Sequence, residues 1–174
     1  MGALDIIREI CERKEYKSIN NDIDKNIYFT HAYLLEIFDA NDSYEYDKEG
    51  DIFIFKAKDN INYFLRLTYQ PTKIPYCELK FGYFNDTGKA IYTDPGSITD
   101  EKKSNTIAKI YRDECIPLFE KYNKVKDMYI IPIEEDMRRY RYARMLVNKF
   151  PISNTEIIED PPHKIIIRKK DLSK

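Results

Sequence analysis

The amino-acid sequence predicts an α+β domain in which a mixed, mostly antiparallel sheet is flanked by helices. Three observations support this prediction. Apolar residues alternate with a period of two between residues 44 and 93, which is typical of half-buried strands. A period of 3.6 returns after residue 100, which is typical of amphipathic helices. Two short apolar runs, 127–133 and 163–169, predict buried strands among and after those helices. The 174 residues contain no Ser/Gly linker, so we expect a single domain over residues 1–174.

The first 40 residues predict two helices. Residues 3–14 carry one apolar helical stripe, with acidic charge early and basic charge late, which matches the helix dipole. Residues 31–40 predict a second helix that Thr30 would cap, and a strand over 27–30 is the alternative. The inward-facing side chains of the two helices are Leu4, Ile7, Ile10 and Cys11, and then Tyr33, Leu34, Ile37 and Phe38.

The alternating region predicts an antiparallel meander of three strands, over residues 51–58, 61–70 and 76–84. Asp59-Asn60 is a candidate two-residue turn between the first two strands, although the glycine preferred at its second position is missing. The segment 71–75 has a proline at each end and predicts a rigid connection. A short extra strand is expected over residues 89–93.

The region after residue 100 predicts a long helix, whose apolar stripe runs from Ile107 to Phe119. Pro117 lies inside this stripe. Proline removes one helical hydrogen bond and clashes with the preceding turn, so we expect a kink or a break near residues 114–116. The strand 127–133 then leads to a helix over 134–150, a connection over 151–162 and the last strand, 163–169.

The helix over 134–150 carries the candidate site residues. At 100° per residue, one face collects the apolar side chains Tyr140, Ala143, Leu146, Val147 and Phe150. The opposite face carries Arg138, Arg141 and Arg144, with an exposed Met145 among them, and we name these four as candidate partner-binding residues. Three interpretations remain open: a solvated outer face, a docking surface for a protein partner, and a row of phosphate contacts. The acidic residues 134–136 argue against nucleic acid, because they would face the same phosphates.

The charge distribution is uneven although the net charge is only −1. Residues 1–100 carry 12 basic and 18 acidic side chains, and residues 101–174 carry 17 basic and 12 acidic ones. The low net charge gives no general attraction to nucleic acid or to an anionic membrane. The asymmetry favours docking on a charged protein partner or head-to-tail self-association. Three widely spaced cysteines, without a C-x-x-C pair, predict neither a zinc site nor a disulfide framework, and they indicate a reducing compartment.

The order of the expected elements resembles that of the GNAT acetyltransferase superfamily, as in small phage-encoded proteins. The likeness depends on the meander 51–84, the helix 101–120, the strand 128–133 and the helix 139–150 with Ala143, Leu146, Lys149 and Phe150. The resemblance implies acetyl-CoA held by a glycine-rich loop before the long helix, and a cofactor cleft where the sheet splays at residues 128–133. The matching stretch, 85–103, has Gly88 and Gly96 eight positions apart and does not contain the family motif. Asp94, Asp100 and Glu101 would also repel a pyrophosphate there.

The sequence therefore predicts a non-enzymatic interaction or assembly protein, without a cofactor, that acts on protein partners in a host cytoplasm or a virion. The two histidines, His31 and His163, lie far apart and come with no third ligand at metal-site spacing. We assign no catalytic residue, no metal ligand and no membrane span. An N-acyltransferase that uses acetyl-CoA with an atypical cofactor loop is the alternative, and a nucleic-acid-binding accessory protein is the second alternative.

Overall fold

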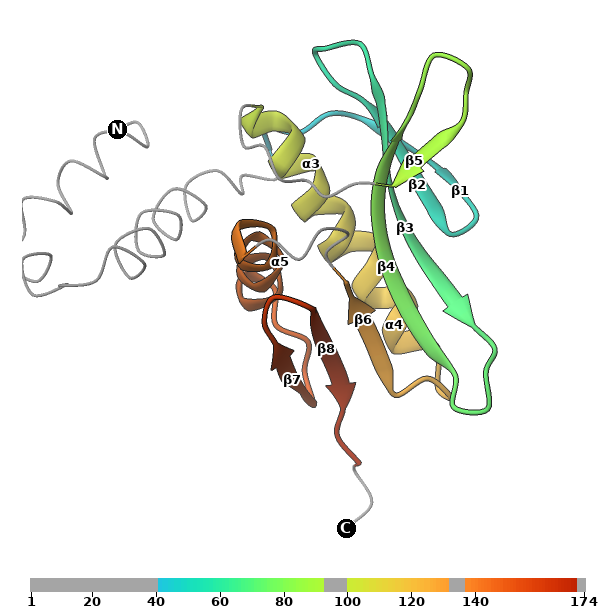
Figure 1. Cartoon of the computed structure of the whole chain (residues 1–174), viewed down its shortest axis with the longest axis vertical. Helices are drawn as coiled ribbons and strands as arrows, with labels where there is room; N and C mark the ends of the chain where they lie inside the picture. The colour runs from blue at the N-terminus through green and yellow to red at the C-terminus, as the bar shows by residue number, and fades with distance from the viewer. Residues whose placement is uncertain (1–40, 93–99, 132–136, 172–174) are drawn as a thin grey trace, which may run out of the picture.

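A computed structural model of the chain describes residues 41–92, 100–131 and 137–171 (Figure 1). The described residues form one eight-stranded, mostly antiparallel sheet with helices packed on it, which confirms the predicted α+β class. Both expected helices of the first 40 residues, and the alternative strand, lie outside the described residues. The elements are β1 (Tyr46–Glu49), β2 (Ile52–Lys56), β3 (Asn62–Gln70), β4 (Tyr76–Phe84), β5 (Ala90–Tyr92), α3 (Glu101–Ile110), a π-helix (Tyr111–Cys115), α4 (Ile116–Lys121), β6 (Asp127–Ile130), α5 (Met137–Lys149), β7 (Thr155–Asp160) and β8 (Lys164–Lys169).

The meander β1 to β4 is antiparallel throughout, and its last three strands confirm the expected ones to within a few residues. The turn between β2 and β3 forms without glycine because Asn60 adopts a positive φ of 68°, which asparagine tolerates. The amide of Ala57 donates to the carbonyl oxygen of Ile61 at 3.1 Å and closes this turn. β5 is the short extra strand, and it pairs with the end of β4.

The long helix is interrupted where Pro117 predicts a break. Between α3 and α4, residues 111–115 form a π-helix, and the amide of Ile116 donates to the carbonyl oxygen of Tyr111. Pro117 has no amide hydrogen, so the regular ladder cannot continue through it, and the wider turn absorbs the mismatch. The chain passes from β4 through β5 and this interrupted helix to β6, and β4 and β6 lie side by side and parallel.

The C-terminal part differs from the sequence prediction at one element. Residues 155–160, expected within a connection, form β7, which pairs with β8 at the edge of the sheet. The segment was missed because acidic side chains interrupt its alternation and leave two adjacent isoleucines, Ile157 and Ile158, as its apolar residues. The strands follow one another across the sheet in the order β1-β2-β3-β4-β6-β8-β7.

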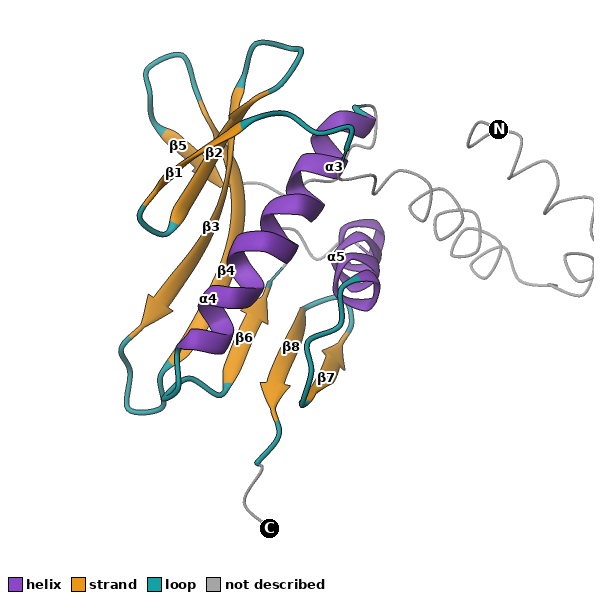
Figure 2. Cartoon of the chain, turned by 180° about the vertical axis from the view of Figure 1, so that it is seen from behind, coloured by secondary structure: helices purple, strands orange, loops and turns teal. Residues whose placement is uncertain are grey.

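The core lies between the sheet and the three helical segments α3, α4 and α5, which pack on the same face (Figure 2). Alternate residues of each strand supply the sheet side, and Tyr111, Phe119, Tyr140, Leu146 and Val147 are among those that supply the helix side. The opposite face of the sheet carries no helix of the described residues.

Candidate interaction surface

The loop between β3 and β4 presents the most exposed large apolar side chain of the described residues. Ile74 is 76% exposed. Pro71 and Pro75 restrict the backbone on either side of it. Two hydrogen bonds involving Thr72 hold the loop further: its amide donates to the carbonyl oxygen of Gln70 at 2.9 Å, and its hydroxyl donates to that of Ile74 at 2.5 Å. The isoleucine is thus presented to solvent on a braced loop.

A tyrosine pair lies beside this loop, and three lysines lie on the loop or next to one of the tyrosines in the chain. The rings of Tyr69, at the end of β3, and Tyr122, after α4, lie 5.5 Å apart between centroids, and Tyr69 is 40% exposed. Lys73 on the loop, and Lys121 and Lys124 beside Tyr122, are exposed and form no ion pair with the described residues. We call this set the loop-end surface. It consists of Tyr69, Lys73, Ile74, Lys121, Tyr122 and Lys124.

Lys169, the last residue of β8, fixes the turn that carries Tyr122. Its ammonium group donates to the carbonyl oxygens of Phe119 and Tyr122 at 2.7 and 2.8 Å, and it lies 4.5 Å from the centre of the Phe119 ring. A cation at the C-terminal end of a helix satisfies the last carbonyl groups. Burial lowers the pKa of Lys169, so the group keeps its contacts at some cost in desolvation.

The structure describes only two of the four predicted partner-binding side chains on α5. The side chains of Arg138 and Arg141 lie outside the described part, so their role stays a prediction. Arg144 is exposed, but its guanidinium is 2.7 Å from the carboxylate of Glu159 on β7. The expectation of an exposed Met145 is wrong, because this side chain is half-buried and packs against the core. The apolar stripe of α5 is wider than the sequence assignment allowed.

The start of α3 is occupied by a carboxylate of this chain. Asp100 caps the helix by accepting from the amide of Lys103 at 3.1 Å, and it also accepts from the hydroxyl of Tyr44 at 2.9 Å. The side chain of Lys103 lies over the ring of Tyr63, at 4.2 Å, and burial lowers its pKa. Helix N-termini attract anions through free amides. Here a carboxylate of the chain already fills that position.

The parallel strands β4 and β6 separate after a short contact. They pair from Tyr76 and Asp127 to Leu79 and Ile130. Beyond Leu79, the same edge of β4 is taken by β5, which pairs with residues 82–84. Gly82 lies so close to β5 and to the ring of Phe64 that a Cβ atom there would collide with both. The backbone groups of β4 are therefore used by β5 at the place where a cofactor cleft was expected.

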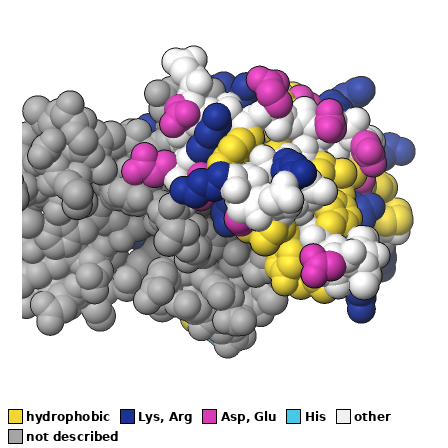
Figure 3. All heavy atoms as spheres, turned by 90° about the horizontal axis from the view of Figure 1, so that it is seen from above, with side chains coloured by type: hydrophobic (Ala, Val, Ile, Leu, Met, Phe, Trp, Pro, Cys, Tyr) yellow, Lys and Arg dark blue, Asp and Glu magenta, His cyan; other side chains and the backbone are white. Residues whose placement is uncertain are grey.

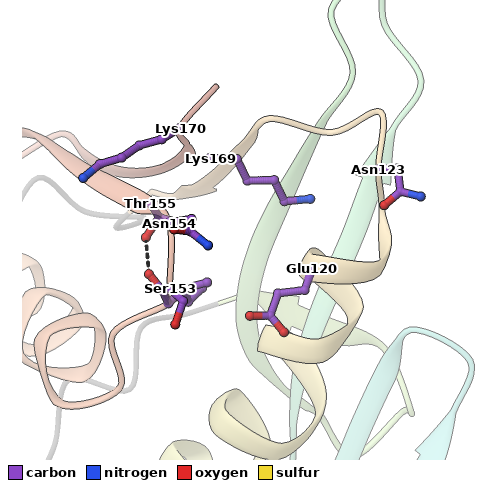
Figure 4. Close-up of a pocket in the computed structure, with 8 residues that line it drawn as sticks. Glu120, Asn123, Ser153, Asn154, Thr155, Lys169 and Lys170 are labelled. Atoms are coloured by element: carbon purple, nitrogen blue, oxygen red, sulfur yellow. Dashed lines mark hydrogen bonds between the residues drawn. The ribbon is translucent and has the colours of Figure 1, made fainter. Parts of the chain in front are cut away.

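A pocket lies between the end of α4 and the connection from α5 to β7 (Figure 4). Its volume is about 300 Å³, and its lining residues are Glu120, Asn123, Ile152, Ser153, Asn154, Thr155, Lys169 and Lys170. Lys169 points its ammonium group toward the helix end and away from Ser153 and Asn154. The pocket is open, and the ammonium group of Lys169 is already held by its hydrogen bonds to the carbonyl oxygens of Phe119 and Tyr122.

The cysteine and histidine side chains form no reactive or metal-binding site among the described residues. Cys77 and Cys115 are buried, and burial raises the pKa of Cys77 to about 11, which keeps its thiol protonated. His163 stands in the turn before β8, whereas Cys11 and His31 lie outside the described part. Among the described residues, no group of three or more His, Cys, Asp or Glu side chains could hold a metal ion. The described helices include none long and apolar enough to cross a membrane.

Comparison of the chain with protein-family models, with curated proteins and with solved structures found no match. The assignment of a site therefore depends on geometry alone. Sequence reasoning missed Ile74, although an isoleucine between two prolines in a polar connection was a visible signal. Tyr69 and Tyr122 were missed because only the fold brings them together.

Proposed function

We propose that the protein is a non-enzymatic interaction and assembly protein that docks on a protein partner, or on a second copy, through the loop-end surface. The observation that supports this most directly is Ile74, which is 76% exposed on a loop that two prolines and two hydrogen bonds brace. A flexible loop would have to be ordered on binding, whereas this one is already held.

The expected energetics fit a protein interface. Full burial of an isoleucine side chain contributes about 1.5–3 kcal/mol, so covering the exposed three quarters of Ile74 would contribute about 1–2 kcal/mol. That equals about five- to thirtyfold in affinity. Tyr69 and Tyr122 add aromatic area of the kind enriched at binding hot spots. Lys73, Lys121 and Lys124 form a charged rim that favours an acidic partner.

We also infer a GNAT-like architecture whose cofactor positions are filled by the chain itself. The strand order, with β4 parallel to β6 and β8 between β6 and β7, supports this inference. Asp100 at the start of α3 and β5 on the edge of β4 occupy the two places that acetyl-CoA would need. These contacts favour the non-enzymatic role, and the resemblance to small phage-encoded proteins extends the proposal to a virion or a host cytoplasm.

An N-acyltransferase remains the second candidate because β4 and β6 do part after Leu79 and Ile130, as the resemblance implies. The test is thermal denaturation with acetyl-CoA. A ligand at 100 times its Kd stabilises the folded state by about 2.7 kcal/mol. An unchanged melting temperature at millimolar acetyl-CoA would exclude this candidate.

The test of the docking function uses the full-length chain. Lysine-directed cross-linking in an extract of source cells, read by mass spectrometry, should give links from Lys73, Lys121 or Lys124 to one protein. That protein is then purified, and its Kd is measured against wild type, Ile74→Ser and a matched control, Ile131→Ser. Ile131 is also exposed, at 46%, but follows β6 away from the loop-end surface.

The proposal expects wild type and Ile131→Ser to bind alike and Ile74→Ser to bind at least about fivefold more weakly. Equal affinity for all three chains would overturn it. Cross-links that disappear after nuclease treatment, with binding that falls steeply as salt rises, would instead indicate the nucleic-acid alternative.

A further inference from the structure

We propose that the loop-end surface docks on an acidic row of a second copy of this chain, so that the protein assembles head to tail. The inference rests on the proposed docking function and names its partner. The acidic row consists of Glu45, Asp47 and Glu49, on and just before β1, together with their neighbours Ile52 and Ile54 on β2.

The fold places the carboxylates of the row together on one side of an edge strand. Tyr46 and Lys48 point toward the helix face, where both bind Glu114 at 2.9 and 2.8 Å. Successive side chains of a strand alternate, so Asp47 and Glu49 point to the opposite face. There they lie beside Ile54 and Ile52, their partners in the strand pairing.

The row is accessible in the described structure. Glu45, Asp47 and Glu49 are exposed, and none forms an ion pair with a described residue. Ile52 and Ile54 are half-buried. β1 pairs only with β2 among the described strands, so its outer edge carries unpaired backbone groups as well. The surface therefore offers negative charge beside apolar area at an open edge.

The two surfaces complement each other in charge and in apolar content. The loop-end surface has three exposed lysines together with Ile74, and the acidic row has three exposed carboxylates beside two isoleucines. Opposite charges steer the encounter and fix the register, and the apolar contact supplies affinity. Pairing β1 with β1 of a second copy would instead bring like charges together, which is unfavourable. The charges therefore favour a contact between different surfaces.

The position of the two surfaces determines what such a contact builds. The loop between β3 and β4 lies at the lower end of the long axis in Figures 1 and 2, and β1 lies in the upper half. Figure 3 shows the upper end, where apolar side chains lie among both signs of charge. A copy engaged through one surface keeps the other free. A contact between unlike surfaces then extends into a ring or an open chain.

The experiment uses two full-length variants with complementary defects. One is Lys73→Glu/Lys124→Glu, which reverses the loop-end charge, and the other is Asp47→Lys/Glu49→Lys, which reverses the acidic row. Lys89→Glu/Lys164→Glu, at lysines in the turn between β4 and β5 and at the start of β8, which belong to neither surface, is the control. Sedimentation velocity measures the size of each protein and of their mixtures, at about 0.05 M and about 0.5 M salt, since salt screens exposed charges.

Wild type and the control should form species larger than a dimer at low salt and shrink at high salt, while each reversed variant alone stays monomeric. An equimolar mixture of the two reversed variants should regain species larger than a dimer, because both contacts between unlike variants again join opposite charges. A mixture that stays monomeric, or variants that assemble like wild type, would overturn the inference. A wild type that is monomeric at every concentration would also overturn it. In that case Ile74-dependent binding to a different protein would leave the docking function standing.

Discussion

Replacing Lys169 with methionine tests whether the end of β8 holds the turn that carries Tyr122. The ammonium group donates two hydrogen bonds, to the carbonyl oxygens of Phe119 and Tyr122. A hydrogen bond from a charged donor contributes about 1.5–3 kcal/mol. Burial offsets part of this, because it lowers the pKa of Lys169. Each carbonyl also keeps a backbone partner, the amides of Tyr122 and Val125. We therefore expect a net loss of about 1–2 kcal/mol.

For a chain of this size a loss of 1 kcal/mol lowers the melting temperature by about 2–4 °C, so Lys169→Met should melt about 2–8 °C below wild type. Lys170→Met is the matched control, since its exposed neighbouring side chain forms no hydrogen bond or ion pair with the described residues. Calorimetry measures both. Equal melting temperatures for Lys169→Met and Lys170→Met would refute the role assigned to this lysine. A second measurement is the affinity of docking. At temperatures where Lys169→Met is still folded, this variant should bind its partner more weakly than wild type does.

Three further predictions test the neighbouring elements. Gly82→Ala should lose about 1–3 kcal/mol in denaturant titration, because the new methyl group collides with β5 and Phe64; an unchanged midpoint would show that β5 does not press on β4. Asp100→Ala should lose about 0.5–2 kcal/mol through the missing helix cap, with Asp100→Asn closer to wild type; equal losses would contradict a capping role. Burial and the hydrogen bond to Glu114 raise the pKa of Tyr46 to about 12, so its stabilisation is complete below pH 10 and is lost between pH 10 and 12. Denaturant titrations across that range should therefore fall more steeply for wild type than for Tyr46→Phe, and parallel curves would contradict this.

The elements that the sequence predicted correctly are those whose signal is local. Alternation located β2, β3 and β4 because each buries one face against the same helices. Pro117 predicted the interruption of the long helix, because any proline lacks the amide hydrogen that a regular helix needs. Asn60 formed the predicted turn without a glycine for the same local reason, its tolerance of positive φ.

The errors share the opposite cause, which is that the deciding contact comes from a distant segment. β7 is an edge strand that depends on β8 for its pairing, so its own sequence need not be apolar. Met145 is half-buried because the core extends under the border of α5, which periodicity on one helix does not reveal. Arg144 finds Glu159 on β7, a strand that had not been expected.

The loop-end surface combines both situations. Its apolar tip, Ile74, is determined by the local sequence. Pro71 and Pro75 make the connection rigid and leave Ile74 without a strand or helix to cover it. Its flank is assembled from β3, from the turn after α4 and from the last residue of β8, which meet only because β6 lies between β4 and β8. A change at position 169 should therefore weaken docking without touching the partner, whereas a change at position 74 should weaken docking without changing the melting temperature. Measuring both quantities for both variants separates a residue that positions the surface from one that forms the contact.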